Sequence, residues 1–252
     1  MVRPTHYTVL PLIYDRWQRS YGKDYSAVVL PLLLSSLRRR RLTPGTMVDV
    51  ACGTGSLAVL MAGRGWRVWG IDASGAMIAE GWKKTTARRL PVLFLRQDMR
   101  RLRLPEKVNL ATSVFDSLNH LRSLADLKTT LRRVHAALLP GGWFMFDVNN
   151  ERCYRLLWTR EQSLTHRDFT LLLNNSYNPG TRRAQSRVRI LLPGKDKPRV
   201  LQETVRERCF TPEEIASALA RAGFVDTERR DFNPTDRVRI GRIKSWWVAR
   251  RA

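Results

Sequence analysis

The sequence predicts an α/β protein with a doubly wound, mostly parallel sheet. Buried-strand patterns alternate with helical patterns from about residue 46 to residue 149, which is the order of elements that a parallel sheet requires. A glycine turn, Gly53-Thr54-Gly55, separates the β-branched run Met47–Val50 from the apolar stretch Leu57–Ala62. Several predicted strands also end in an acidic residue. Because parallel strands end at one edge of their sheet, we expect these acids to gather beside the glycine turn.

The glycine turn is a candidate ligand-binding feature. Glycine adopts positive φ freely and lets a ligand touch bare backbone, and Ser56 is the expected N-cap of the helix that follows. The segment also fits G-x-G-x-x-G/A, the dinucleotide fingerprint, which is a weak signal by itself. Asp49 favours a different ligand, because a pyrophosphate gains nothing from a nearby carboxylate, whereas the ammonium group of S-adenosyl-L-methionine does.

The next two predicted strands carry acids at corresponding places. The strand over residues 68–72 ends at Asp72, which can accept hydrogen bonds from both ribose hydroxyls, as it would in an NAD enzyme. A helix is predicted over residues 73–87, with Ser74 as its cap. The third strand, beginning at residue 92, leads to Asp98, which is placed to accept from an adenine amino group while Met99 packs on the ring.

The motifs VDVACGTGS, GIDAS, RQDM, VFDSLNHL and LLPGGWFMFDVN together resemble the class I S-adenosylmethionine-dependent methyltransferases. The resemblance covers roughly residues 14–149, and the chain is similar to small-molecule N-methyltransferases of the amino-sugar or glycine type. It implies a Rossmann-like methyltransferase fold with S-adenosyl-L-methionine as cofactor. The cofactor-binding residues that it implies are Tyr14, Asp49, Ala51, Cys52, Gly53, Thr54, Gly55, Asp72, Ala73, Ser74, Met77, Gln97, Asp98, Met99, Phe115, Asp116 and Ser117.

Residues 1–42 form an aromatic, helix-prone lead-in. The resemblance implies that this segment is a helical lid over the cofactor, in which Tyr14 lines the site and takes part in catalysis. The alternative is that the aromatic residues pack the segment onto the domain. The apolar run Val28–Leu37 is far below the roughly 20 residues of a spanning helix, and we expect it to lie across the sheet edge. The aromatic residues are Tyr7, Tyr14, Trp17, Tyr21 and Tyr25.

The loop after the fourth predicted strand, residues 108–115, should face the methyl group, because ligands of open α/β sheets lie beyond the carboxyl ends of the strands. Methyl transfer is an in-line displacement, so alignment supplies most of the catalysis. The acceptor atom must also lose a proton, and His120 in this loop is the candidate base. A similar loop in amino-sugar N-methyltransferases has a histidine at the matching place. The alternative is that His120 caps the next helix or orients the lid.

The alternating pattern continues to Asn149 and then changes. A helix over residues 124–139 is followed by Pro140-Gly141-Gly142, which should end it and lead into a fifth strand over residues 143–148. Residues 151–210 instead show strand-like runs separated by Pro-Gly turns. They predict an antiparallel β insertion, and the resemblance implies that it covers the substrate site or forms a homodimer contact. Its arginines would meet an anionic substrate or form a solvated face; they are Arg182, Arg183, Arg187 and Arg189.

The α/β pattern resumes at residue 211. Thr211 is an expected N-cap with Pro212 at the first helical position and Glu214 completing a capping box. Two further strands, over residues 224–230 and 243–250, form an antiparallel edge hairpin and bring the main sheet to seven strands. Residues 43–150 are therefore predicted to form the cofactor-binding core, and residues 211–252 to complete it.

The composition is that of an ordinary globular domain with an unusual charge. The 252 residues carry a net charge of +23, and arginine suits the phosphate oxygens of a partner such as RNA. The basic residues are scattered, however, and no RNA-binding module accompanies them. The fourth strand also lacks the Asn/Asp-Pro-Pro-Tyr loop of base-methylating enzymes. The three cysteines are far apart, which predicts no zinc site or disulfide framework and fits a reducing cytoplasm.

We therefore predict a cytoplasmic enzyme that transfers a methyl group to a nitrogen or oxygen atom of a small molecule, for which an anionic acceptor would suit the positive charge. It is expected to use no metal ion and to need no membrane. The first alternative is an RNA methyltransferase, and the second is a non-catalytic cofactor-binding domain. An NAD-dependent oxidoreductase is disfavoured by Asp49 and Asp98.

Overall fold

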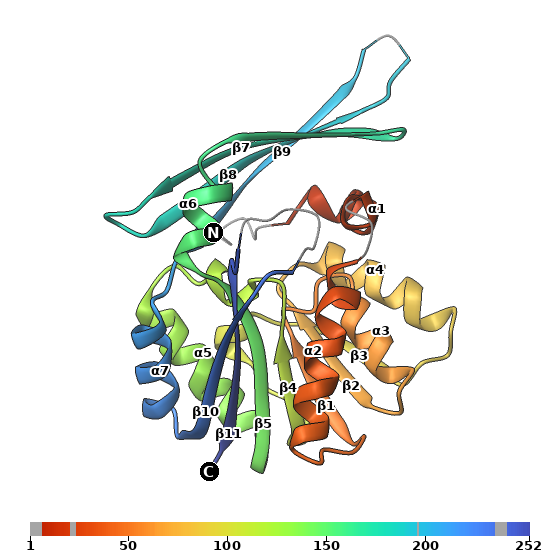
Figure 1. Ribbon diagram of the computed structural model, residues 1–252. Coiled ribbons are helices and arrows are strands. Elements are labelled where there is room, and N and C mark those ends of the chain that lie inside the picture. Colours follow the sequence, from red (N-terminus) through yellow and green to blue (C-terminus); the bar gives the residue numbers. More distant parts are fainter. Residues whose placement is uncertain (1–6, 21–23, 196, 235–240) are drawn as a thin grey trace.

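The computed structural model describes residues 7–20, 24–195, 197–234 and 241–252, which build two sheets (Figure 1). The larger sheet has seven strands in the order β10-β11-β5-β4-β1-β2-β3. Strands β1 to β5 pair in parallel, whereas β11 is antiparallel to both β5 and β10. The predicted fold class is confirmed. The strands are β1 (Thr46–Val50), β2 (Arg67–Asp72), β3 (Val92–Arg96), β4 (Val108–Ser113), β5 (Leu138–Asn149), β10 (Phe224–Phe232) and β11 (Lys244–Arg251).

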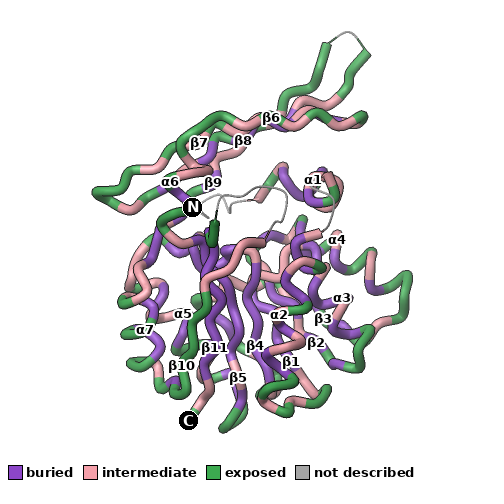
Figure 2. Tube along the Cα trace, viewed as in Figure 1, coloured by how far each residue is buried: buried purple, intermediate pink, exposed green. Residues whose placement is uncertain are grey.

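Helices cover both faces of this sheet, and its central strands are the most buried part of the molecule (Figure 2). One apolar cluster joins the sheet to α5 and α7, and a second joins it to α2, α3 and α4. No helix among the described residues is long and apolar enough to cross a membrane. The helices are α1 (Tyr14–Ser20), α2 (Tyr25–Arg39), α3 (Ser56–Ala62), α4 (Gly75–Thr86), α5 (Leu124–Ala137), α6 (Glu151–Leu157) and α7 (Pro212–Arg221), with short 3-10 turns η1 (Leu10–Leu12), η2 (Met99–Arg101) and η3 (Ser117–His120).

The sequence predicted that the helix over residues 28–37 lies across the edge of the sheet. Helix α2 instead lies on a face of the sheet. Val29 and Leu33 are fully buried in one cluster with Met47 of β1 and Leu110 of β4. The apolar residues of α2 therefore find partners on the central strands, which offer more buried area than an edge. Of the predicted lid, only η1 and α1 lie above the sheet; residues 1–6 and 21–23, including Tyr21, lie outside the described residues.

Two local predictions at chain turns were wrong. Ser56 is the first residue of α3, and its N-cap is Gly55, whose φ of 73° places it in the left-handed region. Strand β5 begins at Leu138, directly after α5, so the Pro-Gly-Gly segment lies inside the strand. The pairing of β5 with β4 shifts register there, and Gly141 has a φ of 76°. The glycines thus form an irregularity within the strand, where positive φ costs them little.

The predicted insertion is an antiparallel sheet of four strands in the order β6-β7-β8-β9, which lies above the larger sheet with α1 beneath it (Figure 1). Its first strand and α6 were not predicted. Leu10 and Ile13 of the lid share an apolar cluster with Val188 and Ile190 of β8, so one face of the insertion packs on the lid. The strands are β6 (Glu161–His166), β7 (Phe169–Asn178), β8 (Arg183–Leu192) and β9 (Arg199–Arg208).

The arginines of β8 follow from this packing. Arg187 and Arg189 are exposed and alternate with the buried Val188 and Ile190, so they form the solvated face that we gave as one of two alternatives. Arg182 instead pairs with Glu214 of α7 at 2.8 Å. Among the described residues, these arginines do not reach the cavity described next.

Candidate functional site

A cavity of about 590 Å³ opens between the carboxyl ends of the parallel strands, the lid and β9. Most of the predicted site residues line it, although they come from five separate segments of the chain. The structure therefore brings together what the sequence places over more than a hundred positions. The predicted residues on its wall are Tyr14, Ala51, Gly53, Asp72, Ala73, Ser74, Met77, Gln97, Asp98, Met99, Phe115, Ser117 and His120.

Two acidic residues, Asp72 and Asp98, line the cavity. Asp72 at the end of β2 accepts hydrogen bonds from the backbone N–H groups of Gly53, at 2.9 Å, and Ser74, at 2.8 Å. Burial raises the pKa of Asp72, and these N–H groups offset part of the increase. Asp98 caps η2 and pairs with Arg100 at 2.5 Å. Burial opposes ionisation of Asp98, but the hydrogen bonds from Arg100 outweigh it and lower the pKa.

Five predicted cofactor-binding residues do not line the cavity: Asp49, Cys52, Thr54, Gly55 and Asp116. Asp49 lies within β1, and its carboxylate accepts a hydrogen bond from the Thr112 hydroxyl at 2.8 Å. Burial raises the pKa of Asp49 to about 7. Gly55 serves as the helix cap, and the Thr54 hydroxyl points to Asp15 of the lid, to which it donates at 2.6 Å. These residues thus support the cavity wall from behind.

The floor of the cavity is a turn with unusual backbone geometry. Phe115 and Asp116 have φ angles of 62° and 52°, a region that disfavours residues with a Cβ. Asp147 at the end of β5 holds this turn by accepting the N–H of Phe115 at 2.6 Å and that of Asp116 at 3.2 Å. The fully buried Asp147 also accepts from Tyr25 and Lys244, each at 2.9 Å.

His120 is on the cavity wall, at the end of η3. Its Nδ1 lies 3.4 Å from the carbonyl oxygen of Arg206, and its Nε2 lies 3.2 Å from the Tyr7 hydroxyl. A carbonyl only accepts, so this contact favours the tautomer with hydrogen on Nδ1 and leaves the lone pair on Nε2. His120 does not cap α5, because Ser123 does so by accepting from the N–H of Asp126.

Tyr14 packs among aromatic rings at the roof of the cavity. Its ring meets those of Tyr7 and Trp17 edge to face, with centroids 6.0 and 5.6 Å apart. Burial raises the pKa of Tyr14 well above its usual value, so the phenol stays neutral near pH 7. The structure therefore supports Tyr14 as a wall or hydrogen-bonding residue, and its neutral phenol does not suit a base.

Two arginines also line the cavity, and the sequence did not indicate them. Arg122, just after the His120 loop, and Arg206 of β9 are exposed residues on the wall. Tyr7 also lines the cavity, and the aromatic character of the lid was its only signal. Strand alternation could have flagged Arg206, but nothing in the sequence relates β9 to the cofactor-binding strands. Arg100 and Leu121 complete the residues that were not predicted.

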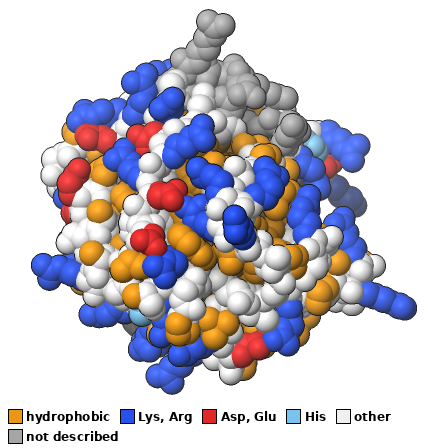
Figure 3. Space-filling view, turned by 60° about the horizontal axis from the view of Figure 1, so that its bottom comes forward, with side chains coloured by type: hydrophobic (Ala, Val, Ile, Leu, Met, Phe, Trp, Pro, Cys, Tyr) orange, Lys and Arg blue, Asp and Glu red, His pale blue; other side chains and the backbone are white. Residues whose placement is uncertain are grey.

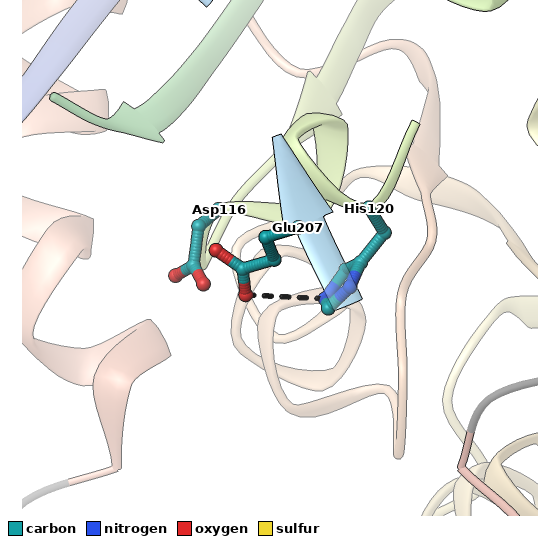
Figure 4. A group of neighbouring side chains, drawn as sticks. All are labelled: Asp116, His120 and Glu207. Atoms are coloured by element: carbon teal, nitrogen blue, oxygen red, sulfur yellow. Dashed lines mark ion pairs between the residues drawn. The ribbon is translucent and has the colours of Figure 1, made fainter. Parts of the chain in front are cut away.

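Asp116 and Glu207 lie next to His120 and do not line the cavity, and the three side chains point toward one another (Figure 4). Their ligand atoms are within 4.8 Å of one another, a spacing that can suit a metal ion. We assign them no metal, because the ammonium of Lys244 already lies 2.6 Å from Asp116 and supplies the positive charge.

Residues 47–142, which include the glycine turn and the His120 loop, match the sequence model of a family described as a methyltransferase domain. This stretch of the chain is therefore similar to a methyltransferase domain. A dTDP-3-amino-3,6-dideoxy-alpha-D-glucopyranose N,N-dimethyltransferase of Streptomyces fradiae is 33% identical over 131 residues, which are 52% of this chain and 49% of that enzyme. The chain spans about half the length of the curated relatives it matches.

Solved structures share the fold of the methyltransferase domain and of the insertion. An S-adenosylmethionine-dependent methyltransferase from Clostridium acetobutylicum superposes with a TM-score of 0.81 at 21% identity, over 98% of this chain and all of that one. An amino pentose methyltransferase from Micromonospora echinaspora, solved with bound S-adenosylmethionine, gives 0.74 at 22% identity over the whole of both chains. The predicted Rossmann-like methyltransferase fold is confirmed.

Proposed function

We propose that this protein is an S-adenosyl-L-methionine-dependent methyltransferase that methylates a nitrogen or oxygen atom of a small, anionic molecule. The observation that carries the proposal is the set of charged side chains on one cavity wall. Asp72 and Asp98 line the cavity together with Arg122, Arg206 and His120. A cofactor with ribose hydroxyls and an adenine amino group suits the two carboxylates. An acceptor with a phosphate or carboxylate group suits the arginines.

The cofactor would lie against the glycine turn. Asp72 lines the cavity, and its carboxylate also orders the glycine turn by accepting the N–H of Gly53. Met99 and Met77 offer apolar surface for the adenine ring. Asp49 is buried within β1 and does not line the cavity, so we assign it no direct contact with the cofactor. We propose that it supports the glycine turn from within the strand that leads into it. The methyl group would then face the floor turn, Phe115–Ser117.

His120 is proposed as the base. Its Nε2 lone pair accepts the Tyr7 hydroxyl at 3.2 Å, so an acceptor would take the place of that hydroxyl before it gives up its proton. A neutral imidazole accepts a proton near pH 7. In the transfer, the electron pair of the acceptor atom forms the new bond to the methyl carbon, and the pair of the broken C–S bond returns to sulfur. Nitrogen is the favoured acceptor atom, because named relatives act on amino groups of sugars.

A small acceptor fits the closure of the site better than RNA does. The lid and the inserted sheet lie over the strand ends (Figure 1), and Glu203 of β9 fixes the lid by accepting the N–H groups of Thr8 and Leu10 at 2.7 and 3.1 Å. Figure 3 shows the side of the molecule turned away from the inserted sheet, where basic side chains are spread out and interrupted by apolar and acidic ones. We propose that the insertion covers the site, one of the two roles predicted for it; a homodimer contact and a cytoplasmic location stay predictions.

The test is a calorimetric titration with S-adenosylhomocysteine, run beside NAD and NADP, on the wild type and Asp72→Ala. We expect micromolar binding of S-adenosylhomocysteine that the variant loses. A second arm measures S-adenosylhomocysteine production with primary amines that carry a phosphate, a carboxylate or no anionic group. Turnover only with the anionic amines supports the proposal. Binding of a nicotinamide cofactor in place of S-adenosylhomocysteine contradicts it, and turnover that ignores the anionic group contradicts the acceptor class.

A further inference from the structure

Glu207 is a buried carboxyl group that the proposed reaction does not yet use. It belongs to β9 and is only 5% exposed. One of its oxygens, Oε2, accepts hydrogen bonds from the Tyr154 hydroxyl at 2.7 Å and from the Asn149 side chain at 3.2 Å. Both partners are donors, so Oε2 is a hydrogen-bond acceptor. The other oxygen, Oε1, faces away from them and toward His120 (Figure 4).

The second oxygen of Glu207 belongs to a carboxyl pair. A carboxyl oxygen of Glu207 and one of Asp116 lie within 4.8 Å of each other. Two carboxyl groups this close in a buried site repel each other strongly unless one of them carries a proton. Lys244 decides which one, because its ammonium lies 2.6 Å from Asp116 and stabilises the negative charge there. Of the two carboxyl groups, Glu207 is therefore the one expected to carry the proton.

The electrostatics agree with this assignment. Burial and the neighbouring Asp116 raise the pKa of Glu207 well above its usual value. Burial also opposes ionisation of Asp116, but the ammonium of Lys244 outweighs it and keeps that pKa below its usual value. Like charges in one desolvated site cannot both be ionised cheaply, so one proton held between two carboxyls is the favoured state.

His120 lies next to the pair. Its Nε2 is 3.9 Å from Oε1 of Glu207, which is within range of a strong charge interaction at a buried site. Glu207 does not line the cavity, whereas His120 does. His120 therefore lies between the cavity and the carboxyl pair. An acceptor would lose its proton in the cavity, and the pair holds a proton that can move between its two members.

We propose that Asp116 and Glu207 form a proton-sharing pair that serves as the counter-ion of His120 during methyl transfer, with Glu207 as a positioning residue. The inference rests on the proposed function. When Nε2 takes the acceptor's proton, the proton on Glu207 moves to Asp116, and the carboxylate left on Glu207 faces the new imidazolium. After His120 releases its proton to water, the proton on Asp116 returns to Glu207. No proton is lost or gained by the pair.

Other titratable and charged groups face this site from the elements packed around it. In the proposal, the protonation state of each of these groups stays the same throughout the reaction. They are Tyr7 of the lid, Tyr25 of α2, Asp147 of β5, Cys153 and Tyr154 of α6, Arg206 of β9 and Lys244 of β11. Burial raises the pKa of each of the three tyrosines well above its usual value, so they remain neutral when the histidine titrates.

The experiment is an NMR titration of the histidine rings in the full chain, with and without S-adenosylhomocysteine, for the wild type and Glu207→Gln. The His120 signal is assigned as the one missing from His120→Asn. Glutamine copies the protonated glutamic acid and can keep the hydrogen bonds to Oε2, so a purely structural role of Glu207 predicts an unchanged titration. Our proposal predicts that the His120 pKa falls by about one unit or more in Glu207→Gln. A fall of one unit means that the equilibrium constant for protonating His120 is about tenfold smaller.

Glu161→Gln is the matched control, because Glu161 lies on the same inserted sheet and is exposed. It should leave the His120 titration unchanged. Asp116→Asn removes the charge that keeps Glu207 protonated, so Glu207 should ionise in this variant and the His120 pKa should rise. An unchanged His120 titration in a folded Glu207→Gln protein, or a lowered His120 pKa in a folded Asp116→Asn protein, overturns the proposal.

The titration needs no acceptor, so the two proposals fail separately. If S-adenosylhomocysteine binds and the His120 pKa does not respond to Glu207→Gln, the counter-ion role is wrong and the methyltransferase proposal stands. If the His120 pKa responds but S-adenosylhomocysteine does not bind, the pair exists and the proposed function is wrong.

Discussion

The ammonium of Lys84 in α4 lies 2.6 Å from a carboxylate oxygen of Asp15 in the lid helix α1. The Thr54 hydroxyl donates to the other oxygen of Asp15 at 2.6 Å, and Lys84 also donates to Thr54 at 2.8 Å. We call Asp15, Thr54 and Lys84 the lid clasp. It ties the lid directly to the glycine turn, so closure of the lid and order of the turn should depend on each other.

Lys84→Met should open the lid clasp and weaken S-adenosylhomocysteine binding about fivefold, because a partly buried ion pair contributes about 1 kcal/mol. Isothermal titration calorimetry measures this effect, and a double-mutant cycle with Asp15→Asn isolates the pair. The neighbouring Lys83 is mostly exposed and pairs with Glu80, so Lys83→Met is the control. Equal loss of binding in the two lysine variants would show that the clasp has no specific effect.

Lys244→Met should destabilise the protein by about 3–5 kcal/mol, because it leaves buried carboxylates without their cation. The side chain of Lys244 is 6% exposed and contacts both Asp116 and Asp147. Urea unfolding at pH 7 measures the loss, and Lys107→Met, at an exposed site, should be silent. A change below about 1 kcal/mol in the Lys244 variant would contradict the role of this lysine.

Asp49→Asn should make the ligand-free protein more stable at pH 8 and leave its stability unchanged near pH 4. Burial raises the folded-state pKa of Asp49 to about 7, above the unfolded value of about 3.9. The carboxyl is protonated in both states at low pH, so the penalty for burying it grows only as pH rises from about 4 to 7 and is complete above that. The gain is on the order of 4 kcal/mol at most.

Denaturant unfolding at several pH values measures this difference between Asp49→Asn and the wild type. Asparagine can still accept the hydrogen bond from the Thr112 hydroxyl, so the comparison isolates the charge. Glu80→Gln, on the surface of α4, should show no such pH dependence. A stability difference that is the same at pH 4 and pH 8 would contradict the burial of an ionisable Asp49.

Gly55→Ala should destabilise the protein by about 2–4 kcal/mol and abolish S-adenosylhomocysteine binding. A Cβ at this residue would lie 2.6 Å from the Phe94 ring, and its φ of 73° is strained for alanine. Gly141→Ala is the control, because it has a similar φ of 76° but open space around the Cβ. Thermal unfolding of both variants separates strain from overlap, and equal losses would show that the contact with Phe94 is unimportant.

Elements with local signals could be predicted from the sequence. The Thr211 capping box is present as predicted, with Glu214 completing it, and Ser74 caps α4. Caps and glycine turns depend on residues within about four positions of one another, so a short pattern contains all the information they need. The order of strands and helices followed for the same reason, and it placed Asp72 and Asp98 at one edge of the sheet.

The tertiary structure alone decided which polar side chains serve the cavity. Arg206 and Glu207 are neighbours on β9, yet Arg206 lines the cavity while Glu207 is buried behind His120. Successive residues of a strand point to opposite sides, and only the packing of β9 against η3 fixes which side faces the site.

By itself, the sequence determined a methyltransferase-like α/β core with a glycine turn and acidic strand ends. It did not determine that Arg122 and Arg206 line the cavity, or that charged side chains are buried beneath the cavity floor. Lys244 lies 128 positions from Asp116, in what the sequence shows as an ordinary edge strand. A buried charge is tolerated only where folding supplies its partners, and those partners are set by contacts between distant segments.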